Sequence, residues 1–251
     1  MIVTFQHGDI RELRLNRPPV NALTPELISA LQGAINSATQ EGARALVLSG
    51  SPGIFSAGLD IPALLKLDPT SMQALWRDFY RLLGIMAKSP IPIAAALTGH
   101  APAGGTVISL FCDWRVAAEG DGKLGLSEVL VGLPLPPVIY GALQRLVGIR
   151  EAQRLALFGL LINPAQALTL GLVDELVPLD HVVPRAIAWC EQLLKLPTVA
   201  MQTTRKLARA DLARLFEAGI DPEIEMVAAS WWHEETQRAL RVVADRLTKK
   251  K

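Results

Sequence analysis

A recurring order of short apolar strand, small-residue loop and helix most constrains what this chain can fold into. Apolar runs at residues 43–51 and 90–99 each lead into loops of small residues and then into a probable helix start. Strand, loop and helix repeated several times is typical of α/β proteins, because each strand needs a helix to cover its apolar face. We therefore expect an α/β fold.

Periodicity and proline and glycine signals predict the individual segments. The strand-like patterns lie at residues 2–16 (a hairpin), 43–51, 90–99, 113–119, 124–127 and 172–177. The helical patterns lie at residues 27–38, 70–87, 107–111, 137–147, 184–196, 199–216 and 223–247. Thr24 is expected to cap the first helix, with Pro25 at its first position. A boundary near Pro197 would separate a core of residues 1–196 from a C-terminal helical region of residues 197–251.

Composition argues against several classes of function. A net charge of +1 gives no support to binding of nucleic acid or of a membrane surface. The uncharged stretches at residues 89–112 and 155–173 are interrupted by proline, glycine and polar residues, so neither is expected to span a membrane. Cys112 and Cys190 lack metal-ligand spacing, and no metal site is expected. The N-terminus shows no leader pattern, so we expect a cytoplasmic protein, or a mitochondrial matrix protein that is already processed.

Two loops carry the candidate chemistry: FSAGLD at residues 55–60 and APAGGT at residues 101–106. Each leads into a probable helix start, where backbone N–H groups are unpaired and the helix dipole is positive. Two such N–H groups converging on one oxygen would form an oxyanion hole. Either loop alone is weak evidence for such a site, since glycines that follow strands commonly form simple turns. The order and spacing of the two loops are more informative.

FSAGLD, then GHAPAGG and then GLSEVLVGLPL resemble the crotonase (enoyl-CoA hydratase/isomerase) superfamily. LRLNRPPVNAL and VDELVP fit the same pattern, so the resemblance spans nearly the whole chain. It implies a crotonase-like spiral core of ββα turns with a C-terminal helical trimerisation region. It also implies a homotrimer or a dimer of trimers, and an acyl-CoA thioester substrate. Coenzyme A would be part of the substrate, and no separate cofactor is implied.

Site residues follow from matching positions with the superfamily. The resemblance implies that the backbone N–H groups of Ala57 and Gly104 bind the thioester oxygen, and that Glu128 is the catalytic base. The apolar sequence around Glu128 predicts a raised pKa, which suits a base working near neutrality. The positions matched to substrate binding are Ala22, Gly58, Leu59, Asp60, Ile61, Gly105 and Pro136. Asp113 and Arg115 are expected to form buried structural hydrogen bonds instead.

Val107 occupies the position at which hydratases of the superfamily carry a second glutamate. Hydration must activate water and protonate carbon, and two carboxylates divide that work. One base is enough to remove a proton from C2 and return it to C4. The sequence therefore favours a Δ3,Δ2-enoyl-CoA isomerase of the mitochondrial type, acting in β-oxidation of fatty acids. Two alternatives stay open: a hydratase, lyase or hydrolase that uses Glu128 alone, and a non-catalytic acyl-CoA-binding protein.

Overall fold

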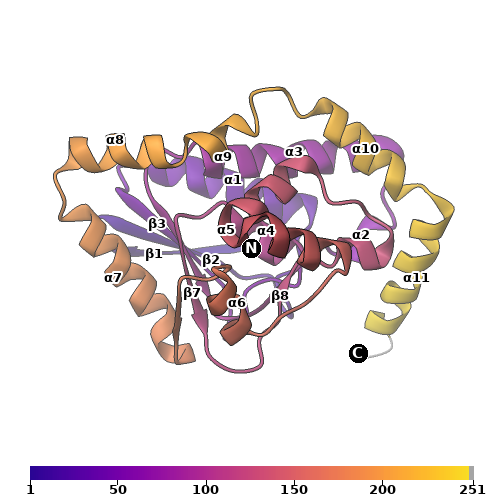
Figure 1. Cartoon of the computed structure of the whole chain (residues 1–251), viewed down its shortest axis with the longest axis horizontal. Coiled ribbons are helices and arrows are strands. Elements are labelled where there is room, and N and C mark those ends of the chain that lie inside the picture. Colours follow the sequence, from indigo (N-terminus) through magenta and orange to yellow (C-terminus); the bar gives the residue numbers. More distant parts are fainter. Residues whose placement is uncertain (249–251) are drawn as a thin grey trace.

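A six-stranded sheet forms the centre of the computed structural model, which describes residues 1–248 (Figure 1). Its strands, in spatial order, are β1 (Ile2–His7), β2 (Ile10–Leu15), β3 (Ala45–Ser49), β5 (Ile93–Leu97), β7 (Trp114–Ala118) and β9 (Glu175–Val177). The β1–β2 hairpin is antiparallel, as predicted, and every other pair in this sheet is parallel. The expected α/β architecture is confirmed.

A second, three-stranded parallel sheet places the candidate loops. Its strands are β4 (Gly53–Ile54), β6 (Gly99–Pro102) and β8 (Leu124–Gly125), in that order. Each follows a strand of the large sheet in the chain: β4 follows β3, β6 follows β5 and β8 follows β7. This repetition is the expected crotonase-like spiral of ββα turns. Because the three short strands are parallel neighbours, the segments that leave their C-terminal ends emerge side by side.

Helices cover both faces of the large sheet. They are α1 (Pro25–Gln40), α2 (Ile61–Leu64), α3 (Pro69–Ala87), α4 (Gly104–Leu110), α5 (Pro137–Leu157), α6 (Pro164–Leu170), α7 (Val182–Leu194), α8 (Thr198–Ala208), α9 (Ala210–Arg214), α10 (Asp221–Trp231) and α11 (Glu234–Thr248), with 3₁₀ turns η1 (Glu128–Val131) and η2 (Leu179–His181). Leu46 and Leu48 point into the main core, whereas Ala45 and Val47 face α7 on the other side. This alternation is the two-residue period of a strand buried on both faces.

Helix α1 begins as the sequence predicts. Pro25 is its first residue, and the Oγ1 of Thr24 accepts a hydrogen bond from the N–H of Leu27 at 3.3 Å. Helix α6 was not predicted, although Asn163, Pro164 and Gln166 form a complete capping box at its start. Its capping residues were the signal that could have located it.

Three long helical patterns differ from the prediction. Residues 199–216 divide into α8 and α9 at Arg209, whose backbone leaves the helical region and whose side chain is buried. Residues 223–247 divide into α10 and α11 after Trp231. Helix α5 runs on to Leu157, through a kink at Gly148 where φ is +77°. Tertiary contacts and a glycine in the left-handed region decide these bends, and periodicity does not report either.

The predicted boundary falls at Pro197, which is the N-cap of α8. The division into a core and a C-terminal region stays a prediction, and residues 249–251 of that region lie outside the described residues. Figure 1 shows α8, α9 and α10 following one another along one edge of the molecule, with α11 turning down beside α2. None of the helices within residues 1–248 is both long and apolar enough to cross a membrane.

Candidate active site

The three-stranded sheet brings the predicted catalytic segments together. Loop 55–60 follows β4, α4 follows β6, and the segment that carries Glu128 follows β8. The N–H of Ala103 donates to the carbonyl of Gly125 at 2.8 Å, and the N–H of Gly125 donates to the Oγ1 of Thr106 at 2.8 Å. The N–H of Phe55 donates to the carbonyl of His100 at 2.9 Å. All three segments are therefore held beside one another by backbone pairing.

Gly58 and Gly104 lie in direct contact. A Cβ atom on Gly58 would lie 3.0 Å from the backbone nitrogen of Gly104, and one on Gly104 would lie 3.2 Å from the Cα of Gly58. A Cβ on Gly105 would lie only 2.5 Å from the carbonyl oxygen of Ser56. The close approach of the two loops therefore requires these glycines, although a glycine pair weakens the start of a helix.

The N–H of Ala57 is not available as an oxyanion donor. It donates to the carbonyl of Val20 at 3.0 Å. The N–H of Leu59 is a candidate instead, because within residues 1–248 it has no hydrogen-bond partner. Leu59 forms a parallel bridge with Leu23, in which the neighbours of Leu59, Gly58 and Asp60, make both hydrogen bonds, at 2.7 and 3.0 Å. The hydrogen bond to Val20 argues against the predicted donor Ala57, and Leu59 is the candidate in its place.

Gly104 supplies the second candidate donor. It is the first residue of α4, so its N–H has no intrahelical partner, and no other described residue accepts from it. A Cβ on Gly104 would lie 3.5 Å from the nitrogen of Leu59, which places the two backbone segments next to each other. Ala103, the N-cap, makes no side-chain capping bond and has φ of +49°. Two unpaired N–H groups thus lie on adjacent segments.

Glu128 begins the 3₁₀ turn η1 and buries its carboxyl group. Its Oε2 is buried without a hydrogen-bond partner among the described residues. Burial raises the pKa of Glu128 to about 7, as its apolar surroundings predicted. Val129 and Leu130 are exposed, so the carboxyl group is desolvated by other parts of the core than these sequence neighbours. Pro136 is buried at the N-cap of α5, on the turn that follows η1.

Asp60 has a structural part in this region. Its Oδ1 accepts from the N–H of Ala63 at 3.0 Å, and its Oδ2 pairs with Arg17 at 2.7 Å. Arg17 also donates to the carbonyl of Ala22 at 3.2 Å. Sequence reasoning did not single out Arg17, although it stands in the loop motif NRPPVNAL. This arginine joins the predicted positions Ala22 and Asp60, and Ile61 follows directly as the first residue of α2.

Helix α11 packs against elements on two sides of the candidate site. It packs against both α2 and η1, and Figure 1 shows it beside α2. The Oγ1 of Thr236 donates to the carbonyl of Gly132 at 3.0 Å, directly after η1. The last described helix therefore contacts the elements on both sides of the candidate site.

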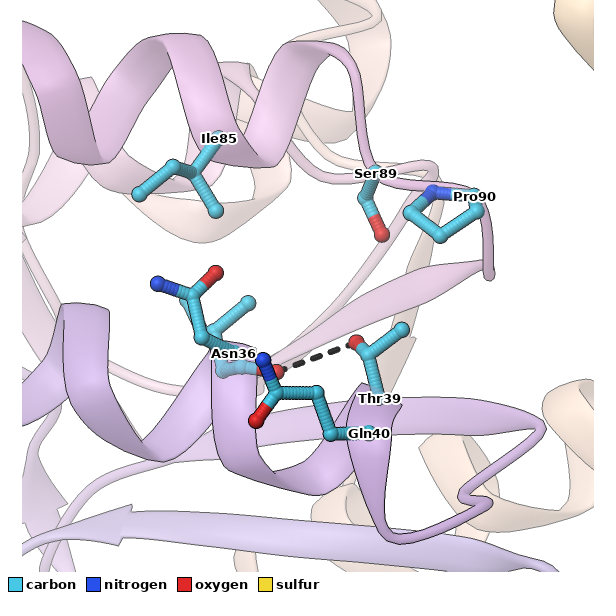
Figure 2. A pocket seen from close by; sticks show the side chains of 7 residues that line it. Asn36, Thr39, Gln40, Ile85, Ser89 and Pro90 are labelled. Atoms are coloured by element: carbon cyan, nitrogen blue, oxygen red, sulfur yellow. Dashed lines mark hydrogen bonds between the residues drawn. The ribbon is translucent and has the colours of Figure 1, made fainter.

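The groove between α1 and α3 is separate from these residues. It has a volume of about 190 Å³, and Figure 2 shows Asn36 and Gln40 on one side and Ile85 and Ser89 on the other. None of the predicted site residues lines it. Among residues 1–248, no group of three or more His, Cys, Asp or Glu side chains is placed to hold a metal ion.

Comparison with known proteins shows where this geometry recurs. The family described as enoyl-CoA hydratase/isomerase matches residues 6–249. The chain belongs to this family. It is 30% identical to mouse mitochondrial enoyl-CoA delta isomerase 1, over 100% of this chain and 88% of the mouse protein. It is 31% identical to the probable enoyl-CoA hydratase EchA17 of Mycobacterium tuberculosis, over 95% of this chain and 87% of that protein.

The fold of this enoyl-CoA hydratase/isomerase family member also matches solved structures. The crystal structure of human mitochondrial delta3-delta2-enoyl-CoA isomerase superimposes with a TM-score of 0.94 and 27% sequence identity. The match covers 100% of this chain and 99% of the human one. The recognition of the crotonase superfamily, and of similarity to its mitochondrial isomerases, is therefore confirmed.

Proposed function

We propose that this protein is a Δ3,Δ2-enoyl-CoA isomerase that converts 3-enoyl-CoA to 2-trans-enoyl-CoA. Its family supports crotonase-type enoyl-CoA chemistry in general. One observation carries the finer assignment: the Oε2 of Glu128 is buried without a hydrogen-bond partner among the described residues, while the other acidic position of the hydratases is Val107, buried in the core. A single base suits the transfer of a proton between two carbons of one substrate.

The reaction follows from three groups. The thioester oxygen accepts hydrogen bonds from the N–H groups of Leu59 and Gly104. Glu128 removes a proton from C2, and the electrons of that C–H bond form a C1–C2 double bond while negative charge moves onto the thioester oxygen, which gives a dienolate conjugated with the C3–C4 double bond. The protonated Glu128 then returns the proton to C4, which leaves the double bond between C2 and C3. A pKa of about 7 suits a group that must both accept and return a proton.

The remaining predicted residues take positions around this centre. Ala22, Gly58, Leu59, Asp60 and Ile61 would contact the coenzyme A part of the substrate. Because both carboxylate oxygens of Asp60 are engaged, we expect its contact to be through the backbone.

Gly105 and Pro136 would border the acyl group. The chemistry assigned to Glu128, Leu59 and Gly104 requires no metal and no cofactor besides the coenzyme A of the substrate.

Assembly into a homotrimer or a dimer of trimers is part of the proposal. Several large apolar side chains of the helical segments are more than half exposed in the single chain, which is typical of surfaces that pack against another subunit. These are Ile149, Leu157, Phe158, Val199 and Leu207. Light scattering of the purified protein would measure the mass, and a monomer would contradict the assembly.

The cellular location stays a prediction between the cytoplasm and the mitochondrial matrix. The mouse and human relatives carry mitochondrial names. A part in β-oxidation of fatty acids belongs to the same proposal.

Turnover of 3-hexenoyl-CoA tests the assignment. The conjugated 2-enoyl product absorbs in the ultraviolet, so its formation can be followed directly. We expect turnover by the wild type and a loss of about 1,000-fold in kcat for Glu128→Gln, since a positioned acid–base group contributes about 10² to 10⁴. Glu119→Gln, at an exposed glutamate, is the control and should match the wild type. Absence of turnover, or turnover unchanged in Glu128→Gln, would overturn the isomerase assignment.

Hydration by Glu128 alone is the second candidate, because the relative EchA17 is named a probable enoyl-CoA hydratase. Incubation of 2-hexenoyl-CoA in heavy-oxygen water distinguishes the two reactions. An isomerase leaves the product unlabelled, whereas a hydratase or a hydrolase incorporates the label. Calorimetric binding of the thioester without proton exchange at C2 would instead indicate a non-catalytic acyl-CoA-binding protein.

A further inference from the structure

The C-terminal end of helix α4 is bound by two buried arginine side chains. The Nη1 of Arg115 donates to the carbonyl of Ser109 at 3.3 Å and to that of Cys112 at 3.0 Å. The Nη2 of Arg209 donates to the carbonyl of Phe111 at 2.9 Å. The helix itself carries no charged residue and is buried along its whole length. The two cations therefore lie at the negative end of the helix dipole, opposite the end at which Gly104 stands.

The two arginines come from different parts of the fold. Arg115 lies on β7 of the central sheet, whereas Arg209 lies between α8 and α9 in the C-terminal region. Arg209 also donates to the carbonyl of Met86 at the end of α3, at 3.1 Å. Both arginines are nearly inaccessible to solvent, at 3% and 6%. The far end of α4 is thus fastened to the sheet, to α3 and to the C-terminal helices at once.

The charges around this helix end do not balance by themselves. Arg115 pairs with Asp174 at 2.8 Å, while Arg205 and Arg209 share Asp113 at 2.8 and 3.2 Å. These three guanidinium groups face two carboxylates, which leaves one excess positive charge in the cluster. Burial raises the pKa of the Cys112 thiol to about 12, so this thiol adds no charge. The carbonyls at the end of α4 supply the remaining negative potential.

The arrangement does not optimise the arginines' own hydrogen bonds. The Nε atoms of Arg115 and Arg209 are both buried without a partner among the described residues. An unpaired buried donor is unfavourable. The two side chains therefore bind the helix carbonyls although each leaves one of its own N–H donors without a partner. The hydrogen bonds of Asp113 and Arg115 confirm the buried structural role that the sequence predicted for both residues.

We propose that Arg115 and Arg209 are positioning residues that hold the oxyanion donor Gly104 from the opposite end of its helix. The inference rests on the proposed function, in which the Gly104 N–H binds the thioester oxygen. The first turn of α4 is held by the N–H of Ala103, which donates to the carbonyl of Gly125, and by Thr106, whose Oγ1 donates to Ala101 and accepts from Gly125. A helix of seven residues is about 10 Å long, so contacts at its C-terminal end help to set the direction of its first N–H.

Loss of the arginine contacts at the C-terminal end of α4 should weaken stabilisation of the transition state more than it weakens substrate binding. The negative charge on the thioester oxygen forms only as the proton leaves C2, so donor alignment matters most at that stage. Coenzyme A contacts lie on other segments and set most of the affinity. We therefore expect a fall in kcat with little change in KM.

The test uses substitutions at Arg209 in the full chain. Arg209→Met removes the charge and the donors at similar length, and Arg209→Lys keeps the charge with a compact donor group. Arg145→Met is the matched control, because Arg145 ties α5 to the same C-terminal segment through Asp211 and the carbonyl of Ala208, and its described hydrogen bonds include none to α4. Kinetics on 3-hexenoyl-CoA give kcat and KM. The infrared carbonyl frequency of bound hexanoyl-CoA, labelled with carbon-13 at the thioester, reports donor alignment without turnover.

We expect Arg209→Met to lower kcat about tenfold, below the 10² to 10³ lost with a whole oxyanion donor, and to change KM less than twofold. The bound carbonyl frequency should move back toward that of free hexanoyl-CoA. Arg209→Lys should fall between the wild type and Arg209→Met, and it decides the matter if Arg209→Met does not fold. Arg145→Met should match the wild type in both readouts.

The outcomes separate this inference from the proposed function. If both Arg209 variants keep the kcat and the bound carbonyl frequency of the wild type, the positioning role is overturned and the isomerase assignment still holds. An equal loss in Arg145→Met would also overturn it, because general loosening of the C-terminal segment would then explain the effect. A wild type that turns over 3-hexenoyl-CoA without any carbonyl shift would overturn the oxyanion assignment of Gly104, and the positioning role with it. A wild type without turnover would overturn the proposed function itself.

Discussion

Glu12 and Glu128 are two buried carboxylates with opposite surroundings. Glu12, on β2, is 1% exposed and has partners on both oxygens. Its Oε1 accepts from Ser49 at 2.6 Å and pairs with Arg14 at 2.8 Å, and its Oε2 lies 3.1 Å from the Nε2 of His7. Glu128 has a buried Oε2 without any partner among residues 1–248.

The comparison shows that burial alone does not make a carboxylate reactive. At Glu12, hydrogen bonds and a neighbouring guanidinium compensate for the lost hydration, so the charge stabilises the fold. At Glu128 the backbone N–H of the same residue compensates only in part, and burial raises the pKa of the carboxyl to about 7. A site that must exchange protons near neutrality needs the second arrangement.

The largest difference is expected in stability. Glu12→Gln should lower the free energy of unfolding at pH 8 by about 3 kcal/mol, because it removes a buried charge that accepts from Ser49 and pairs with the partly exposed Arg14. Glu128→Gln should not destabilise the protein, since it removes a buried charge whose Oε2 has no partner among the described residues. Urea denaturation of both variants measures this. Equal losses in the two variants would contradict the distinction between them.

The pH dependence of stability should show the raised pKa of Glu128 directly. The folded protein keeps its proton up to about pH 7, whereas the unfolded chain loses it near the ordinary value of 4.5. Folding therefore binds a proton between these values, and the wild type should lose about 3 kcal/mol relative to Glu128→Gln as the pH rises from 4.5 to 7. Above pH 7 the difference should be constant. A difference that is flat from pH 4.5 upward would contradict the raised pKa.

Substitution of the neighbouring serines gives a smaller and more local contrast. Ser49→Ala removes the 2.6 Å hydrogen bond to Glu12 and should lower the free energy of unfolding by about 2 kcal/mol, as for other bonds to charged groups. Ser127→Ala, beside Glu128, should change it by less than about 0.5 kcal/mol. Thermal unfolding of the two variants compares them. A stronger effect at Ser127 would show that Glu128 has a partner after all.

The last prediction concerns the pH dependence of kcat/KM, which should change gradually with each pH unit. If Glu128 acts as the base, kcat/KM for 3-hexenoyl-CoA should fall about tenfold for each pH unit below 7, because only the ionised form accepts a proton. Glu119→Gln should keep the same profile. A rate that stays constant down to pH 5.5 would mean that the catalytic base is another group.

Much of the architecture follows from local sequence. Thr24 and Pro25 start a helix because a hydroxyl caps unpaired N–H groups and proline fits the first helical turn. The hairpin of β1 and β2 and the buried central strands follow from two-residue periodicity and continuous apolar runs. The breaks near Arg209 and after Trp231 did not follow, because they depend on what the side chains contact across the fold.

The candidate site divides in the same way. The sequence by itself determined the two glycine loops and the apolar Val107, since each depends on residue type. It also predicted the raised pKa of Glu128, but the burial that raises it comes from the tertiary structure, because Val129 and Leu130 are exposed. Only the tertiary structure decided which N–H groups are free. Val20, in a distant loop, accepts the N–H of Ala57, while pairing with Leu23 turns the N–H of Leu59 away from its neighbour. A backbone N–H is identical in every residue except proline, so its availability depends on the strand or loop beside it, which sequence pattern does not report.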